Sequence, residues 1–245
     1  MTPLWHYDVS RLGNSHRLLG VDEAGRGALA GPVVAGAVLV SRDFYESPWC
    51  QEHAHRIQDS KQIPESEREE LGMILRDATS CGIWFGVGTA SVEEIARDNI
   101  LGATRLAMQR AMEHAIHNTP PDCHLAPVGT EEPLFQRETP RSAPAVWVDG
   151  LPLRPFPYRH EGLVRGDQLS LVIAMASILA KTERDAILRS LDRQFPQYGF
   201  ARNKGYAGKR HFAALEEYGP SPVHRQLFLR KWRARSLATQ TEWRF

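Results

Sequence analysis

The stretch that most constrains the fold covers residues 18–40 and reads LLGVDEAGRGALAGPVVAGAVLV. Each end of this stretch is apolar enough to form a buried strand. Asp22 and Glu23 nevertheless stand side by side within the first of these two strands. Neighbouring side chains of a strand point to opposite faces, so at least one of these acids would face a core. Burying a carboxylate without a partner is costly. The pair therefore indicates either an edge strand with two solvated acids or a carboxylate site for a metal or for catalysis.

Composition favours one large domain, or one with a small appendage. The chain has 245 residues, of which 42% are hydrophobic, so it can bury a sizeable core without disulfides. Its three cysteines form no CxxC or Cys/His pattern, which favours a reduced, cytoplasmic protein without a zinc site. The longest apolar-looking run, at residues 27–40, is far shorter than a membrane span, and the N-terminus MTPLWHYDVS lacks a secretory signal pattern. We expect no membrane contact.

Charge is spread unevenly along the chain, although the formal net charge is only +1. Residues 200–245 carry 10 Lys and Arg against 3 Asp and Glu, a net of +7, which leaves −6 for residues 1–199. A basic terminal segment beside an acidic body suggests that one part binds a polyanion while the other acts on it. A solvated charged helix would give the same count.

Apolar runs bounded by turn residues predict five strands. Those at residues 18–24, 33–40 and 83–90 are expected to form an antiparallel meander. The run AVWVD at residues 145–149 is typical of a buried strand that ends at an aspartate, and residues 162–165 suit a short fifth strand.

Helical patterns fill the intervals between these strands. A helix with a charged outer face begins at residue 64, and Ser91 with Glu94 forms a capping box for a second that runs toward residue 117. Asp167 stands where an N-cap belongs, before a long helix over residues 168–195. The remaining predictions are a proline-rich surface loop at residues 118–144 and two short basic helices at residues 209–218 and 221–236.

Four acids stand within or at the ends of these elements: Asp22, Glu23, Asp149 and Asp167. Taken singly, Asp149 before a glycine can be a turn residue and Asp167 can be an N-cap. Taken together, hard oxygen ligands without a His or Cys cluster suit Mg²⁺ or Mn²⁺. Two such ions about 4 Å apart can clamp the attacking and leaving oxygens of a phosphodiester displacement. Spacing alone does not show that the four acids meet.

Several separated motifs resemble, in the same order, type 2 ribonuclease H, the bacterial ribonuclease HII family. They are GVDEAGRGALAGPVV, DSK at 59–61, GVGTAS followed by EIARDNILGATRLAMQRA, VDG at 148–150, RGD at 165–167, ASILAKTERD, YGFARNKGY and GPSPVHR. The resemblance covers residues 18 to about 228. It is specific because many motifs agree and no single short pattern decides it.

The resemblance implies an α/β protein with an RNase H-like fold, in which a mixed five-stranded sheet is flanked by helices and followed by a small helical C-terminal segment. Residues 1–199 would form the catalytic core, with the surface loop at 118–144, and residues 200–245 the basic helical segment. The resemblance also implies an activity. The family cuts the RNA strand of RNA–DNA hybrids and nicks DNA on the 5′ side of a single embedded ribonucleotide, leaving 3′-hydroxyl and 5′-phosphate ends.

Site residues follow from the same resemblance, position by position. The family's catalytic and metal-binding acids match Asp22, Glu23, Asp149 and Asp167, with Mg²⁺ or Mn²⁺ as the cofactor. Cations would explain why paired acids are tolerated within a strand, and without metal the protein should fold more easily once one of them is neutralised.

Recognition of a ribonucleotide requires a close partner for its 2′-OH, the mark that separates RNA from DNA. Glycines on both sides of Arg26 let main-chain groups approach a sugar-phosphate. The family reads the junction with this segment and a tyrosine, which match Gly25, Arg26, Gly27 and Tyr206 here. Further candidates for substrate binding, each of which could equally be a structural ion-pair partner, are Lys61, Lys181, Arg184, His224 and Arg225.

Three other interpretations are weaker. Ribonuclease HIII has a similar core with an additional N-terminal domain, whereas about seventeen residues precede the first strand here. A binding protein that lost catalysis would be expected to have substituted acids, and all four are present. A transposase- or integrase-type nuclease gives no purpose to the Gly-Arg-Gly segment or to Tyr206.

Partners follow from the activity. We expect RNA–DNA hybrids and ribonucleotide-containing DNA duplexes as substrates, and nothing in the sequence demands more than a monomer. The tail QTEWRF, residues 240–245, loosely resembles the Gln-plus-hydrophobic peptides that bind the sliding clamp. Aromatic C-terminal tails also pack back on their own domain.

Overall fold

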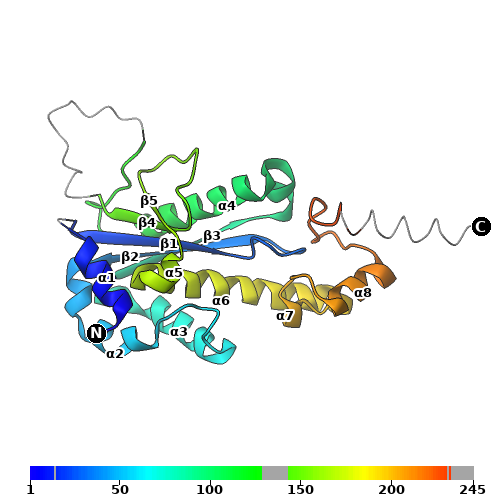
Figure 1. The fold of residues 1–245 in the computed structure, drawn as a ribbon, viewed down its shortest axis with the longest axis horizontal. Helices are drawn as coiled ribbons and strands as arrows, with labels where there is room; N and C mark the ends of the chain where they lie inside the picture. The colour runs from blue at the N-terminus through cyan, green and yellow to red at the C-terminus, as the bar shows by residue number, and fades with distance from the viewer. Residues whose placement is uncertain (14, 129–142, 231, 233–245) are drawn as a thin grey trace, which may run out of the picture.

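The computed structural model describes residues 1–13, 15–128, 143–230 and 232, and it contains one mixed five-stranded sheet in the order β3-β2-β1-β4-β5 (Figure 1). The strands are β1 (Arg17–Ala24), β2 (Val33–Ser41), β3 (Ile83–Ala90), β4 (Ala145–Asp149) and β5 (Glu161–Leu163). β1, β2 and β3 pair antiparallel, as the meander prediction required, whereas β4 pairs parallel to β1 and β5 parallel to β4. The expected mixed sheet is therefore confirmed, although β5 begins one residue earlier and ends two residues earlier than predicted.

Two long helices sandwich the sheet: α4 (Val92–His117) covers one face and α6 (Leu171–Gln194) the other (Figure 1). The remaining helices are α1 (Pro3–Arg11), α2 (Pro48–His53), α3 (Glu65–Asp77), α5 (Gly166–Leu169), α7 (Phe200–Asn203) and α8 (Lys209–Tyr218). Short 3₁₀ turns lie at Arg42–Glu46, Ala54–Arg56, Ala78–Cys81 and Pro196–Tyr198. None of the helices in the described ranges has the length and apolar character needed to cross a lipid bilayer.

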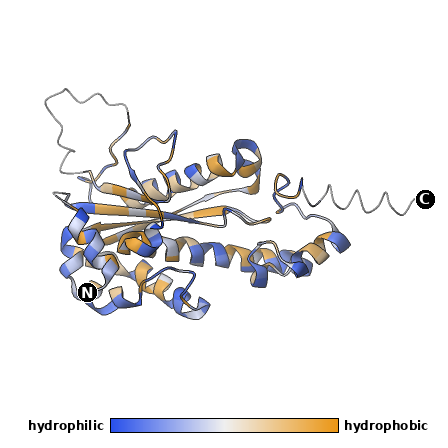
Figure 2. Ribbon diagram, viewed as in Figure 1, coloured by the Kyte–Doolittle hydropathy of each residue, from blue (hydrophilic) through white to orange (hydrophobic). Residues whose placement is uncertain are grey.

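Alternation along the strands gives each face its own core. On β1, Leu18 belongs to the core under α6, while Leu19 and Val21 belong to the core under α4. The hydrophobic colour of Figure 2 is accordingly concentrated in the strands between the two helices. Both faces of β1 and β2 are buried, which explains the near-continuous apolar runs of their sequences.

Glycines in β1 and β2 bring α6 unusually close to the sheet. A Cβ on Gly20 would lie 2.6 Å from the carbonyl carbon of Val172, and one on Gly36 would lie 2.3 Å from the carbonyl oxygen of Ala176. Real Cβ atoms do not approach backbone atoms to these distances, so only glycine fits at either position. The alanine-rich start of α6 therefore lies directly on the strand backbone.

A buried aspartate fastens α1 to the start of α6. The Asp8 carboxylate accepts hydrogen bonds from the Tyr45 hydroxyl at 3.0 Å and from the Val172 main-chain N–H at 3.1 Å. Asp8 is fully buried, and burial raises the pKa of its carboxyl to about 7. Because the contact joins residues 164 positions apart, α1 is stabilised from outside its own sequence.

Two local predictions are wrong. Asp167 does not cap the long helix: it lies inside α5, and Ser170 is the N-cap of α6, with its hydroxyl accepting from the Ile173 N–H. The helix expected over residues 221–236 does not form over 221–229, where the chain runs through turns and a one-residue bridge. The capping box of Ser91 and Glu94 at the start of α4 is confirmed.

We expect Gly36→Ala to destabilise the protein by about 3 kcal/mol or more, the upper end of the cost of overpacking, because its Cβ would meet the α6 backbone. Gly208→Ala is the matched control, since a Cβ there meets no atom within 4 Å. Urea unfolding of both variants measures the difference. Equal free energies of unfolding for the two variants would contradict the proposed close packing.

Candidate active site

The predicted acids of β1 and β4 lie at neighbouring strand ends. β1 and β4 run parallel, with Val21 opposite Val148, so Asp22 and Asp149 follow directly on adjacent strands. Ends of parallel strands meet at one edge of a sheet, and here both ends open toward the same cavity. The pairing of strands that are far apart in the sequence thus brings two of the four predicted acids together.

A cavity of about 470 Å³ collects most of the predicted site residues. Three acids line it, Asp22, Glu23 and Asp149, together with the residues expected to read the substrate. The complete lining is Asp22, Glu23, Ala24, Gly25, Arg26, Gly27, Ser60, Lys61, Asp149, Ser177, Lys181 and Tyr206. The predicted residues that are not part of this wall are Asp167, Arg184, His224 and Arg225.

Burial and mutual repulsion make the acids costly to ionise. Burial, followed by the negative charges of Glu23 and Asp149, raises the pKa of Asp22 well above its ordinary value. Burial also raises the pKa of Glu23, although Arg26 opposes the rise, with its guanidinium 3.6 Å from the Glu23 carboxylate. At Asp149, burial and the charge of Asp167 raise the pKa. A cluster of this kind gains most from a nearby cation.

Asp167 reaches the site through a lysine. Its Oδ2 atom accepts a hydrogen bond from Lys61 Nζ at 3.1 Å, and this contact raises the pKa of the lysine. The preceding residue, Gly166, donates its N–H to Asp149 Oδ1 at 2.6 Å. The short helix α5 therefore joins both aspartates: Asp167 lies within it, and its first residue, Gly166, binds Asp149. The RGD motif lies about one turn before α6.

The loop at residues 59–61 is held by contacts that the sequence did not reveal. Ser60 Oγ lies 2.9 Å from Ser177 Oγ of α6, and Arg68 donates to the Ser60 carbonyl at 2.8 Å. Asp59 accepts from the Lys61 N–H at 3.0 Å and from the Gln168 side chain at 3.2 Å. We interpret Asp59 and Ser60 as residues that position Lys61. In the sequence, the DSK motif at residues 59–61 was the one feature that pointed to these two residues.

The two glycines around Arg26 are needed for different reasons. Gly25 has a φ of +88°, and a Cβ there would lie 1.8 Å from Arg184 Nε, so both its conformation and its neighbour exclude a side chain. A Cβ on Gly27 would meet no atom within 4 Å, which leaves open space beside the cavity. The close approach expected for a sugar-phosphate is therefore structurally available at Gly27.

Two buried arginines hold this glycine loop from behind. Arg184 donates to the carbonyl oxygens of Pro32, Lys204 and Ala30 at 3.2, 2.9 and 3.1 Å. Arg225 donates to those of Gly31, Arg26 and Pro32 at 2.8, 3.1 and 2.9 Å. Both residues have at most 1% of their surface exposed. Either one can act on a substrate only through the loop that it holds.

Tyr206 and Lys181, by contrast, line the cavity, whereas His224 is fully buried away from it. Tyr206 is 39% exposed, and the Arg184 guanidinium lies 5.3 Å from the centre of its ring. Lys181 forms an ion pair with Asp185, and burial lowers the pKa of its ammonium group. Tyr206 is thus available to a ligand, while Lys181 already has a partner within α6.

The donor set fits a hard divalent cation, although the side chains are not drawn tightly together. Throughout the described ranges, no three His, Cys, Asp or Glu side chains are close enough to hold one metal ion. The four acids offer carboxylate oxygens alone, the ligands that Mg²⁺ and Mn²⁺ prefer. Because a carboxylate has about four acceptor sites, a hydrogen bond to one oxygen leaves room for a cation.

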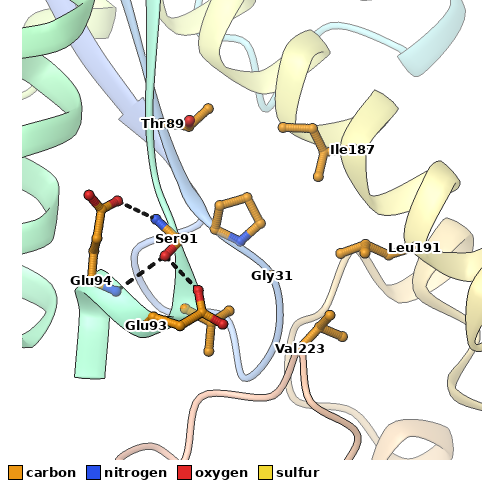
Figure 3. Close-up of a pocket in the computed structure, with 10 residues that line it drawn as sticks. Gly31, Thr89, Ser91, Glu93, Glu94, Ile187, Leu191 and Val223 are labelled. Atoms are coloured by element: carbon orange, nitrogen blue, oxygen red, sulfur yellow. Dashed lines mark hydrogen bonds between the residues drawn. The ribbon is translucent and has the colours of Figure 1, made fainter. Parts of the chain in front are cut away.

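A second cavity, of about 340 Å³, lies outside this site between the start of α4 and the far part of α6 (Figure 3). Its walls are apolar on one side, from Ile187, Leu191 and Val223, while the capping box of Ser91 and Glu94 forms part of the other. None of the four predicted acids lines it. The predicted carboxylate site therefore belongs to the first cavity.

A mixed five-stranded sheet between two helices, with acids at the neighbouring ends of β1 and β4, defines an RNase H-like nuclease fold. More specifically, the chain belongs to the ribonuclease HII family, because the family model described as Ribonuclease HII matches residues 19–124 and 156–233. The resemblance seen in the sequence is thereby confirmed. The protein is a type 2 ribonuclease H, a metal-dependent endoribonuclease.

Individual relatives agree with this assignment. The chain is 37% identical over 214 residues to ribonuclease HII of Caldanaerobacter subterraneus subsp. tengcongensis, which covers 87% of this chain and 74% of the relative. Among solved structures, the PCNA:RNase HII complex from Archaeoglobus fulgidus matches with a TM-score of 0.60 and 20% identity, covering 89% of this chain and 94% of the other. Bst-RNase HIII in complex with Mn²⁺ matches with a TM-score of 0.65 and 17% identity, covering 95% and 73%. The two structural matches support the fold.

We expect Asp22→Asn to stabilise the metal-free protein at pH 8 by about 1–3 kcal/mol, within the usual range of single substitutions. A raised folded-state pKa means that wild-type stability falls as pH rises through that pKa. The advantage of the variant should therefore vanish below the unfolded value of 3.8, where Asp22 is protonated in both states. Urea unfolding in EDTA across this pH range measures it, and equal stability at pH 8 would contradict the prediction.

Proposed function

We propose that this endoribonuclease nicks duplex DNA on the 5′ side of a single embedded ribonucleotide, as well as cutting the RNA strand of RNA–DNA hybrids. The observation that carries the proposal is the shared cavity, in which Asp22, Glu23 and Asp149 face the Gly-Arg-Gly loop and Tyr206. Acids that act on a phosphodiester and groups that read a sugar are thus within reach of one nucleotide. The cellular role that follows is ribonucleotide excision and RNA primer removal in the cytoplasm.

Asp22, Glu23, Asp149 and Asp167 are the residues we propose to hold Mg²⁺ or Mn²⁺. When bound, such ions activate water for attack on phosphorus and stabilise the negative charge on the leaving 3′-oxygen, giving 3′-hydroxyl and 5′-phosphate ends. The protein's own part is to orient the carboxylates. Lys61 does this at Asp167, and the Gly166 N–H does it at Asp149.

Reading of the ribonucleotide is assigned to the opposite wall. The open space beside Gly27 allows main-chain groups to approach the 2′-OH, and Tyr206 offers an exposed ring for stacking on the sugar or the next base. Arg26, whose side chain is 55% exposed, can contact a phosphate while remaining near Glu23. The direct role of each residue toward the substrate is part of the proposal.

The test uses an end-labelled DNA duplex with one internal ribonucleotide, incubated with the protein and Mg²⁺ or Mn²⁺. We expect one product cut 5′ of the ribonucleotide, no cutting of an all-DNA duplex, and a loss of at least about 100-fold in rate for Asp22→Asn, because an ionised ligand is removed. Asp122→Asn, which loses a surface ion pair with Arg17 far from the cavity, is the matched control. Binding without cutting under either metal, or equal cutting of all-DNA, would overturn the proposal.

We also propose that the tail at residues 240–245 binds the sliding clamp. These residues lie outside the described part of the chain, so the support is the sequence QTEWRF together with the existence of an archaeal RNase HII complex with PCNA. Deleting residues 240–245 should abolish binding of the clamp in a pull-down while leaving cleavage of the ribonucleotide duplex unchanged. Unchanged clamp binding after the deletion would end this proposal.

A further inference from the structure

Two buried histidines lie behind Tyr206, outside the set of acids. His211 of α8 and His224 of the C-terminal segment are both fully buried, and their Nε2 atoms are 3.0 Å apart. Rings of Tyr198 and Phe200 pack against both of them. Buried imidazoles that touch each other need a defined arrangement of protons, because one nitrogen must donate and the other accept.

A single main-chain N–H sets that arrangement. The Ser221 N–H, which can only donate, lies 3.0 Å from His224 Nδ1, so this nitrogen accepts. The Ser221 hydroxyl, 2.8 Å from the same nitrogen, can turn to donate to it as well. Neutral His224 then carries its proton on Nε2 and donates it to His211 Nε2. His211 in turn carries its proton on Nδ1, which donates to the Tyr206 carbonyl oxygen at 2.9 Å. The chain of hydrogen bonds therefore runs in one direction, from Ser221 to Tyr206.

Only neutral rings can maintain this chain. A second proton on His211 would place two N–H groups face to face between the imidazoles, and one on His224 would oppose the Ser221 N–H. In agreement with this geometry, burial lowers the pKa of His224 to about 4 and also lowers the pKa of His211. The network thus remains intact at neutral pH.

The same C-terminal segment also contacts the glycine loop. His224 forms a bridge with Ala30, and Arg225 binds the Leu29 carbonyl through its N–H at 2.7 Å. The Arg225 guanidinium donates to the Arg26 carbonyl within the loop. Residues 221–225 therefore fix Tyr206 on one side and the Gly-Arg-Gly loop on the other, the two elements assigned above to reading the ribonucleotide.

We propose that His211 and His224 are positioning residues for ribonucleotide recognition, which hold the Tyr206 main chain in register with the Gly25–Arg26–Gly27 loop. The inference rests on the proposed function, since it gives Tyr206 its role there. Neither histidine touches the substrate. They act by setting the position of the Tyr206 ring over the cavity.

The experiment is a double-mutant cycle on the full chain, with kcat/KM for the single-ribonucleotide duplex as the readout. His211→Leu removes both the acceptor for His224 and the donor to Tyr206, and we expect a loss of about tenfold, the equivalent of one hydrogen bond. In a Tyr206→Ala background the same substitution should cost less than about twofold, because its effect passes through the tyrosine. His211→Gln is the conservative variant: its amide can accept from His224 and donate to Tyr206, so activity should return to within about threefold of the wild type.

Additive losses in the two backgrounds would overturn the inference, because they would mean a general structural role. If His211→Leu does not fold, as judged by urea unfolding, the cycle is run with His211→Phe, whose ring can pack against Tyr198 and Phe200 and has neither nitrogen. Failure of the proposed function is a separate outcome, visible as absent cutting of the ribonucleotide duplex by the wild-type protein. Cutting by the wild type with additive losses contradicts the positioning role alone.

Discussion

The close contact between α6 and the backbone of β1 and β2 determines the rest of the site. Because Gly20 and Gly36 have no side chains, the helix axis comes near enough for Ser177 to meet the loop at residues 59–61 and to line the cavity beside Asp22. A helix displaced outward by the width of one Cβ would separate Ser177 from Ser60 in the loop that carries Lys61. The close packing of α6 on β1 and β2 is therefore required for the charged groups of the site to lie where they do.

Two sets of charged groups that are costly to bury lie close together at this site: the carboxylates and a pair of arginines. On one wall, carboxylates with raised pKa values repel one another, and they are ready to gain from a cation. Behind the other wall, Arg184 and Arg225 are buried with their donors on main-chain carbonyl oxygens. Each guanidinium donates three of the described hydrogen bonds to carbonyl oxygens and none of them to a carboxylate. These bonds leave the positive charge of each arginine without a directly bound carboxylate.

Local sequence patterns predicted the elements whose stability is local, and they failed where stability comes from distant contacts. The strands and the Ser91 capping box follow from alternation and from a short hydrogen-bond motif. The helix α1 was not predicted, although Thr2 and Pro3 are a local start signal for it. Its further anchor, Asp8, is bound to a residue 164 positions away, which no local pattern shows. Asp167 and Ser170 give the same capping signal, and only the contact of Asp167 with Lys61 distinguishes them. The four acids were singled out by their places in the predicted elements, but only the resemblance joined them into one site, since no spacing rule brings β1 beside β4.

The charge count of the C-terminal segment shows why composition overstates what a surface offers to a nucleic acid. The excess of +7 in residues 200–245 includes Arg225, which is buried, and Lys204, which is paired with Glu65 at 2.6 Å. Arg225 holds residues 26–32 through their carbonyl oxygens, and Lys204 joins residues 200–206 to α3. Both side chains are therefore occupied within the protein. Salt would separate the two kinds of charge: it screens exposed charges, which on the proposed function would bind phosphates, while the buried guanidinium contacts that hold residues 26–32 persist.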